Sequence, residues 1–298
     1  MPHSSPVDGF SLTFDRTGAG PAVVLLHGWP GDRRDFRHVV PLLADAADVV
    51  VPDLRGFGES GKHDRPAVEA YSAAAQARSV AGLITELGLD APVLAGYDIG
   101  SRIAQTVARE YPDLVRALVL APPMPGVGDR VLSPGPMREF WYQPFHQLGL
   151  AETLVDGKPD AVRAYLRHFW THWSGPGYQP TESDLDHLTA VYSPPGAFTA
   201  SVNWYRAGSG TVATSAREQA PDPADRIATP LTVLWPEHDP LFPRAWSDRL
   251  EQFFTQPDLR PLDGAGHFVP VEAPAAFAAA ILEHCSQRAG GQGRRQPR

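Results

Sequence analysis

The clearest chemical signature in the chain is the short segment GYDIG at 96–100. It follows the apolar run Val93–Ala95 and precedes a helical pattern. Glycines on both sides of one residue permit a tight strand-to-helix turn that exposes the side chain between them. Turns of this kind usually carry a serine nucleophile, whereas here the central residue is Asp98. A helix-capping aspartate would fit the same position, so the segment by itself makes Asp98 a candidate nucleophile.

An acid and a histidine follow in the chain order that such a nucleophile requires. Asp239 stands in the turn after the apolar run 231–235, and His267 lies in a glycine-rich loop after the run 259–262. A histidine oriented by a carboxylate can act as a general base. Because all three residues are expected at strand ends, we predict that they share one site. Three nearby groups are expected to be bystanders, namely Glu237, His238 and Asp263.

A third motif, HGWPG at 27–31, follows the first long apolar run. Backbone N–H groups in such a loop can stabilise an oxyanion, together with the amide that follows the nucleophile. We expect the donors to be the amides of Trp29 and Ile99, because Pro30 has no N–H. His27 is expected to be structural.

The elements that must position these residues alternate between strand and helix patterns. Continuous apolar runs suit strands that are covered on both faces, as in a parallel sheet. Such runs lie at 22–26, 49–54, 93–95, 115–121, 231–235 and, more weakly, 259–262. Helical spacings fall between them, most clearly over 74–87, 103–109 and 274–285. This alternation predicts an α/β fold with a mainly parallel sheet.

The alternation stops between about residues 124 and 228, where aromatic residues and helical spacings replace the apolar runs. We interpret this stretch as a helical cap, or lid, inserted between two core strands at the edge where open α/β sheets bind ligands. The predicted core domain is therefore residues 1–123 and 229–288, with a cap of residues 124–228 and a flexible tail of residues 289–298.

Composition limits the classes of partner. The 298 residues hold 26 Lys and Arg against 34 Asp and Glu, a formal net charge of −8, which lacks the basic field of nucleic-acid-binding proteins. The single cysteine, Cys285, excludes an internal disulfide and a cysteine-cluster metal site. We see no membrane-spanning stretch and no secretory signal. We therefore expect a cytoplasmic protein without cofactor or metal and without nucleic-acid or membrane partners. The oligomeric state stays open, a homodimer included.

Together these motifs resemble the α/β-hydrolase fold, and within that fold they are similar to the epoxide hydrolases. The resemblance covers nearly the whole chain. It runs through HGWPG, DLRGFGES at 53–60, GYDIG, the turn with Asp239 and GAGH at 264–267. It implies a mainly parallel central sheet with the helical cap inserted between core strands.

The resemblance also implies roles for two tyrosines, since the family places two cap tyrosines over the nucleophile. The segment FWYQ at 140–143 resembles the first tyrosine site, and NWYR at 203–206 resembles the second. These roles therefore fall to Tyr142 and Tyr205. Three other tyrosines lie outside a matching motif and are expected to be packing residues, namely Tyr165, Tyr178 and Tyr192.

The resemblance implies that water opens a small apolar epoxide to a vicinal diol, a reaction suited to detoxification. Asp98 would attack a ring carbon and form an ester, while the phenols of Tyr142 and Tyr205 donate to the ring oxygen. His267, oriented by Asp239, would then activate the water that hydrolyses the ester.

Two alternatives stay open. A haloalkane or haloacid dehalogenase would use the same Asp–His–Asp set, but it would need a halide-stabilising donor beside the nucleophile, where this chain has Ile99. Arg102 resembles one carboxylate-binding arginine of the fluoroacetate enzymes, whereas the corresponding cap pair is Trp141-Tyr142 in place of His-Trp. The other alternative is a non-catalytic ligand receptor of the same fold, against which the complete reactive set argues.

Overall fold

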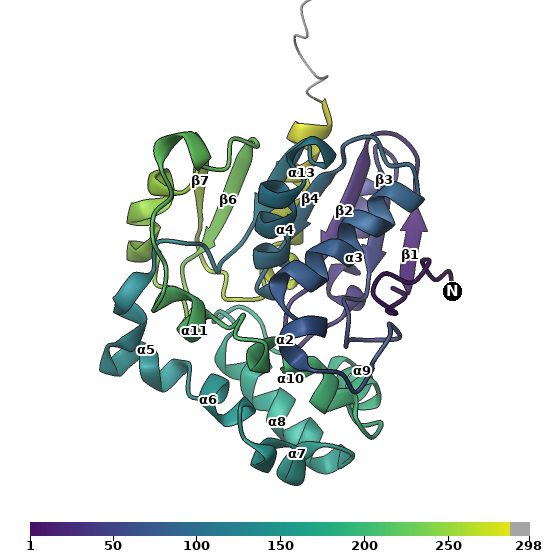
Figure 1. Cartoon of the computed structure of the whole chain (residues 1–298), viewed down its shortest axis with the longest axis vertical. Helices are drawn as coiled ribbons and strands as arrows, with labels where there is room; N and C mark the ends of the chain where they lie inside the picture. Colours follow the sequence, from purple (N-terminus) through teal and green to yellow (C-terminus); the bar gives the residue numbers. More distant parts are fainter. Residues whose placement is uncertain (287–298) are drawn as a thin grey trace, which may run out of the picture.

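A seven-stranded sheet forms the centre of the computed structural model, which describes residues 1–286 (Figure 1). The strand order is β1-β3-β2-β4-β5-β6-β7. All neighbouring pairs are parallel except β1 with β3. The strands are β1 (Phe14–Thr17), β2 (Ala22–Leu26), β3 (Asp48–Pro52), β4 (Val93–Gly96), β5 (Ala117–Leu120), β6 (Leu231–Pro236) and β7 (Pro257–Leu262). The predicted α/β fold with a mainly parallel sheet is confirmed.

Helices cover both faces of this sheet, which explains the continuous apolar runs of its central strands. On one face lie α3 (Ala73–Glu86) and α4 (Ile99–Glu110), and on the other lie α1 (Val40–Leu43) and α13 (Pro274–Ser286) (Figure 1). Every residue of β2, β4, β5 and β6 is buried as a result.

Two elements differ from the sequence-based expectation. Strand β1 was not predicted, because it is an antiparallel edge strand in which Phe14 alone is buried. Helix α4 begins at Ile99, one turn before the predicted start at residue 103. The extra turn contains Gly100 and Ser101, which are weak helix formers but are buried beneath the sheet edge.

A group of helices between β5 and β6 lies at the carboxyl ends of the parallel strands, and we call it the cap (Figure 1). It comprises α5 (Pro134–Glu139), α6 (Tyr142–His146), α7 (Gly149–Val155), α8 (Pro159–His172), α9 (Glu182–Tyr192), α10 (Ala197–Arg206) and α11 (Thr211–Ser215). The remaining short helices are η1 (Arg33–Phe36), α2 (Ala67–Ala70), η2 (Pro112–Leu114), η3 (Gly128–Leu132), η4 (Pro223–Asp225), η5 (Arg244–Gln252) and α12 (Val269–Glu272).

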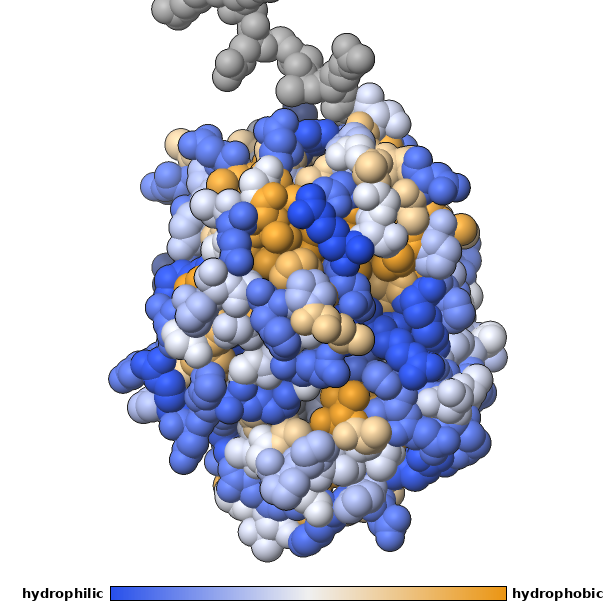
Figure 2. Space-filling model, turned by 90° about the vertical axis from the view of Figure 1, so that its right-hand side faces the viewer, coloured by the Kyte–Doolittle hydropathy of each residue, from blue (hydrophilic) through white to orange (hydrophobic). Residues whose placement is uncertain are grey.

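The surface is mostly hydrophilic where Figure 2 shows it, with small and separate apolar patches. Within residues 1–286, no helix combines the length and the apolar character that a bilayer crossing requires. The predicted tail of residues 289–298 lies outside the described residues.

Candidate active site

Asp98 occupies the sharp turn between β4 and α4, with φ of 50° and ψ of −128°. Residues other than glycine seldom adopt a positive φ, so the surrounding structure must hold this conformation. The turn is tight because α4 starts directly against β2. A Cβ atom on Gly100 would lie 2.1 Å from the carbonyl oxygen of Leu26. The glycine therefore allows the close approach that presents the Asp98 carboxylate beyond the sheet edge.

The two carboxylate oxygens of Asp98 have different partners. Oδ1 accepts hydrogen bonds from the backbone N–H of Ile99 and, at 3.3 Å, from that of Trp29. Oδ2 faces Nε2 of His267 at 3.2 Å. One oxygen thus lies between the two predicted oxyanion donors, and the other faces the predicted base.

Asp239 orients His267 from the opposite side of the imidazole. Nδ1 of His267 lies 2.9 Å from Oδ2 of Asp239. The other Asp239 oxygen, Oδ1, accepts from the N–H groups of Leu241 at 2.8 Å and Phe242 at 3.3 Å. The carboxylate is therefore held in one orientation, and it keeps the Nδ1 proton of His267 in place.

His267 carries a strongly altered pKa. Burial disfavours its charged form, but the negative charges of Asp239 and Asp98 and their hydrogen bonds outweigh burial and raise the pKa to about 10. At neutral pH the resting site therefore holds an imidazolium between two carboxylates. Removal of one of these negative charges would lower the pKa of His267.

The three predicted bystanders lie on the solvent side of the same loops. Glu237 is exposed and accepts from the N–H of Gly264 at 2.9 Å. Asp263 is exposed and pairs with Arg244 at 3.1 Å. His238 is exposed beside Glu237. The end of β6 thus turns Asp239 inward and its two predecessors outward.

Tyr142 and Tyr205 come together from two cap helices, α6 and α10. Their ring centroids lie 5.5 Å apart with perpendicular planes, and both side chains line one small cavity with Asp98. Burial raises the pKa of Tyr142 well above its usual value, and the charge of Asp98 adds to this effect. Burial also raises the pKa of Tyr205, and the neighbouring Tyr142 and the charge of Asp98 raise it further. Both phenols therefore keep their protons in the resting site.

The indole ring of Trp29 also belongs to the site, although the sequence pointed only to its amide. The ring stacks on Tyr142 at 5.5 Å and meets Tyr205 edge-on at 5.8 Å. Its Nε1 donates to the Ser201 hydroxyl at 3.3 Å. The same residue therefore packs against both tyrosine rings and carries one of the two predicted oxyanion donors.

Gln143 is a second residue that the sequence analysis did not single out. Its Nε2 donates to the hydroxyl oxygen of Tyr142 at 3.2 Å, while its Oε1 accepts from the N–H of Val212 at 3.0 Å. In the sequence, the one sign of this role is that Gln143 directly follows Tyr142 in the segment FWYQ. Gln143, on α6, therefore links the Tyr142 hydroxyl to the backbone at the start of α11.

Glu272 is a third such residue, and it fixes the loop that carries His267. Its carboxylate accepts from the N–H groups of Gly266 at 2.8 Å, Phe268 at 3.0 Å and Gly175 at 2.8 Å. Because its partners are backbone amides, one of them in the cap, no side-chain motif could have pointed to it.

The other predicted structural residues lie outside the cavity that Asp98 lines. His27 is buried, with Nδ1 donating to the carbonyl of Gly28 at 2.9 Å and Nε2 accepting from the N–H of Leu54 at 3.0 Å. Tyr165 pairs with His146 at 2.9 Å. Two more tyrosines complete this group, Tyr178, half-buried, and Tyr192, whose hydroxyl donates to the carbonyl of Gly31. Among residues 1–286, no cluster of three His, Cys, Asp or Glu side chains is arranged to hold a metal ion.

Known proteins resemble this chain in sequence and in fold over most of its length. The soluble epoxide hydrolase of Corynebacterium sp. (strain C12) is 29% identical over 283 residues, which cover 91% of this chain and 92% of the relative. Haloalkane dehalogenase 2 of Mycobacterium tuberculosis (strain ATCC 25618 / H37Rv) is 30% identical over 275 residues, covering 89% and 88%. The solved structure of the epoxide hydrolase CorEH without ligand matches with a TM-score of 0.79 and 26% identity, covering 95% and 98%. A family model described as alpha/beta hydrolase fold matches residues 21–274. The chain therefore belongs to the alpha/beta hydrolase fold family.

Proposed function

We propose that this protein is an epoxide hydrolase that adds water to an epoxide through a covalent ester on Asp98. One observation carries the proposal: two protonated phenols, Tyr142 and Tyr205, line the same cavity as a carboxylate backed by a histidine. A carboxylate can attack a saturated ring carbon, and the phenols can supply the proton that the leaving ring oxygen needs. The likeness to a soluble epoxide hydrolase over nine-tenths of the chain supports the same reaction.

In the first step, Oδ2 of Asp98 forms a bond to a ring carbon while the carbon–oxygen bond of the ring breaks. The ring oxygen takes a proton from Tyr142 or Tyr205 and becomes a hydroxyl. Burial raises the pKa of both phenols, so they hold their protons until the opening ring develops the charge of a strongly basic alkoxide. The product is an ester of Asp98 that carries no charge.

Formation of this ester prepares the second step. Loss of the Asp98 charge removes one of the two carboxylates that hold the pKa of His267 at about 10, so the imidazolium gives up its proton. The tyrosine that became a phenolate in the first step takes up this proton and is a phenol again. Neutral His267 then accepts a proton from a water molecule that attacks the Asp98 carbonyl carbon. The amides of Trp29 and Ile99 hold the resulting oxyanion on Oδ1. When the oxyanion collapses, the bond between the Asp98 carbonyl carbon and the ester oxygen breaks, and the departing diol oxygen takes the proton that His267 had accepted. The new carboxylic acid of Asp98 then gives its proton to His267, which restores the resting carboxylate and imidazolium.

A trapped ester tests the proposal. The variant His267→Gln keeps the nucleophile but lacks the base, so an epoxide should add one substrate mass to the protein. Intact-protein mass spectrometry followed by peptide mapping should place this mass on the Asp98 peptide. Asp98→Ala should give neither adduct nor diol. An adduct on another peptide, or none, contradicts the covalent mechanism.

A dehalogenase is the second candidate, and the 30% identity to haloalkane dehalogenase 2 favours it. The side chain of Ile99 has no donor for a departing halide, and the Trp29 indole N–H already bonds Ser201. Halide leaves without a proton, so this reaction has little use for two phenols. Parallel assays of diol formation from an epoxide and halide release from a matched alkyl halide decide between the two.

A further inference from the structure

The cavity around Asp98 is too small to hold a substrate. It measures about 10 Å³, whereas sites for small molecules span roughly 300–1,000 Å³. Asp98, Tyr142 and Tyr205 line this space, which we call the inner cavity. A side chain in its wall must therefore move before an epoxide can reach the nucleophile.

A larger hollow of about 350 Å³ adjoins the inner cavity, and we call it the outer pocket. The two spaces share three lining residues, Arg102, Trp204 and Ser209. These residues therefore form a wall one side chain thick between the surface and the nucleophile. Without that wall, the combined space has the size of an ordinary small-molecule site.

Arg102 is the weakly held member of this wall. It lies one helical turn beyond Asp98, and its Nε is buried without a hydrogen-bond partner within residues 1–286. Nη2 lies 3.5 Å from the carbonyl oxygen of Met124, and Nη1 lies 3.9 Å from Oε1 of Glu218. Buried charged groups are normally paired at hydrogen-bond distance. The closed position therefore leaves the five N–H groups of Arg102 poorly satisfied.

Glu218 offers Arg102 a better position on the outer side. Its Oε2 accepts from the N–H of Gly126 at 2.7 Å, which fixes the carboxylate, while Oε1 faces Arg102. Rotation of Arg102 toward Glu218 would shorten the ion pair to hydrogen-bond distance. The same movement would join the inner cavity to the outer pocket.

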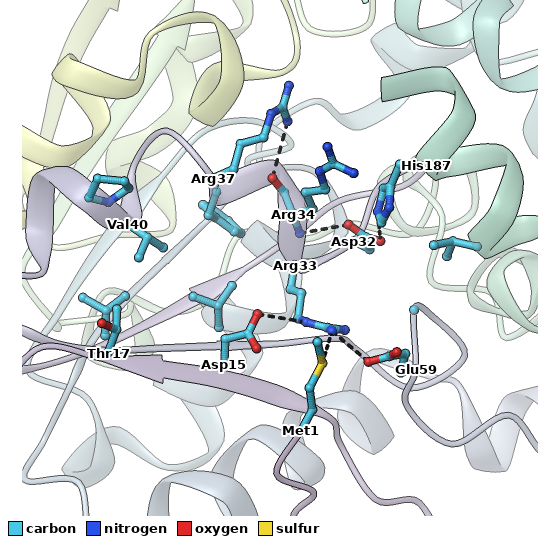
Figure 3. Close-up of a pocket in the computed structure, with 16 residues that line it drawn as sticks. Met1, Asp15, Thr17, Asp32, Arg33, Arg34, Arg37, Val40, Glu59 and His187 are labelled. Carbon is cyan, nitrogen blue, oxygen red and sulfur yellow. Dashed lines mark hydrogen bonds and ion pairs between the residues drawn. The ribbon is translucent and has the colours of Figure 1, made fainter. Parts of the chain in front are cut away.

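The opposite side of the cap is fastened to the core. Figure 3 shows His187 of α9 beside Asp32, with Nε2 and Oδ2 2.6 Å apart. The Trp170 indole and the Tyr192 hydroxyl donate to the carbonyls of Pro30 and Gly31, both at 2.8 Å. Opening the cap there would pull on the loop that carries the Trp29 amide.

The large hollow on that side is separate from the reactive residues. The space in Figure 3, about 450 Å³, is lined by Arg33 with its partners Asp15 and Glu59, among others, and shares no lining residue with the inner cavity. A third hollow of about 760 Å³, beside Lys62 and Thr199, shares none either. Of these three hollows, the outer pocket alone shares lining residues with the inner cavity.

We propose that the outer pocket is the second half of the substrate site and that Arg102 selects the substituent that lies in it. This inference rests on the proposed epoxide hydrolysis and names its substrate class: epoxides whose substituent carries an oxygen acceptor. The N–H groups of Arg102 bond that oxygen when the substrate fills the passage. Polar side chains continue along the pocket, namely Gln105, Thr106 and Thr214.

A matched pair of substrates tests the role of Arg102. Phenyl glycidyl ether and 4-phenyl-1,2-epoxybutane have similar shapes, but the ether has an oxygen where the hydrocarbon has a methylene group. The wild-type protein should prefer the ether by kcat/KM. Arg102→Met keeps a long side chain without N–H groups and should reduce this preference roughly fivefold, as expected for one hydrogen bond. An unchanged ratio overturns the inference.

Chemical blocking tests the passage in a folded protein. In a Cys285→Ser background, Thr214→Cys places a thiol in the outer pocket and Thr199→Cys places one in the third hollow. A bulky maleimide on residue 214 should reduce kcat/KM at least tenfold, and the same label on residue 199 should leave it unchanged. Equal effects at both sites, or none at 214, overturn the inference. If the unlabelled proteins open neither epoxide, the proposed function fails instead.

Discussion

Asp239→Asn should stop ester hydrolysis while leaving ester formation nearly intact. The structure explains why so small a change matters. The N–H groups of Leu241 and Phe242 both donate to Oδ1, so an asparagine at 239 keeps its carbonyl oxygen at that position. Its NH₂ group then occupies the place of Oδ2, 2.9 Å from Nδ1 of His267. An NH₂ group there forces Nδ1 to accept, and the imidazole proton moves to Nε2.

An imidazole protonated at Nε2 cannot take a proton from the attacking water, because Nε2 is the nitrogen that faces Asp98. The corresponding change in serine-protease triads costs roughly 10⁴ in rate, which equals about 5.4 kcal/mol at 1.36 kcal/mol per factor of ten. We expect a loss of this order for hydrolysis. Ester formation does not use Nε2 as a base, so it should change by less than about tenfold.

Rapid-quench mass spectrometry under single-turnover conditions separates the two steps. Asp239→Asn should accumulate the ester on Asp98 within the time that the wild-type protein completes a turnover. The matched control is Glu237→Gln, which removes an exposed carboxylate from the same turn and should be silent. A larger effect of Glu237→Gln, or a nearly silent Asp239→Asn, would refute this reasoning.

Three further predictions concern the phenols, the imidazole and the tight turn. Tyr142→Phe and Tyr205→Phe should each slow ester formation from an epoxide partly, and the double variant should lose roughly 10²–10⁴ in rate but keep any reaction with a matched alkyl halide; an unimpaired double variant would show that the hydroxyls do not matter. The pKa of His267 is about 10 in the folded protein, against about 6.5 in the unfolded chain. Protonation of His267 therefore stabilises the folded state fully below about pH 6.5, and this stabilisation is lost as the pH rises toward 10. The melting temperature should therefore fall from pH 7 to pH 10 more in the wild-type protein than in His267→Gln, and equal decreases would contradict this assignment. Gly100→Ala places a Cβ 2.1 Å from the Leu26 carbonyl, so urea denaturation should show a loss of at least about 1–3 kcal/mol; an unchanged midpoint would mean that the turn can relax.

The sequence by itself determined the features that depend on neighbours along the chain. The glycines around Asp98 allow one tight turn, and continuous apolar runs specify strands buried on both faces. The same analysis did not predict strand β1, because Phe14 alone is buried in it. Chain order also pointed to Asp239 and His267, because each follows a strand of a parallel sheet and such strands end at a common edge.

Only the tertiary structure decides which residues from distant parts of the chain meet in the site. Packing of α6 against α10 places the ring of Tyr142 against that of Tyr205 from distant parts of the chain. Glu272 acts through backbone amides, which every residue type possesses. The poor pairing of Arg102 is visible in the distances to its neighbours and in no pattern of residue types. Burial and charge fall off over a few ångströms in space, so a pKa or a cavity wall depends on contacts that sequence spacing does not encode.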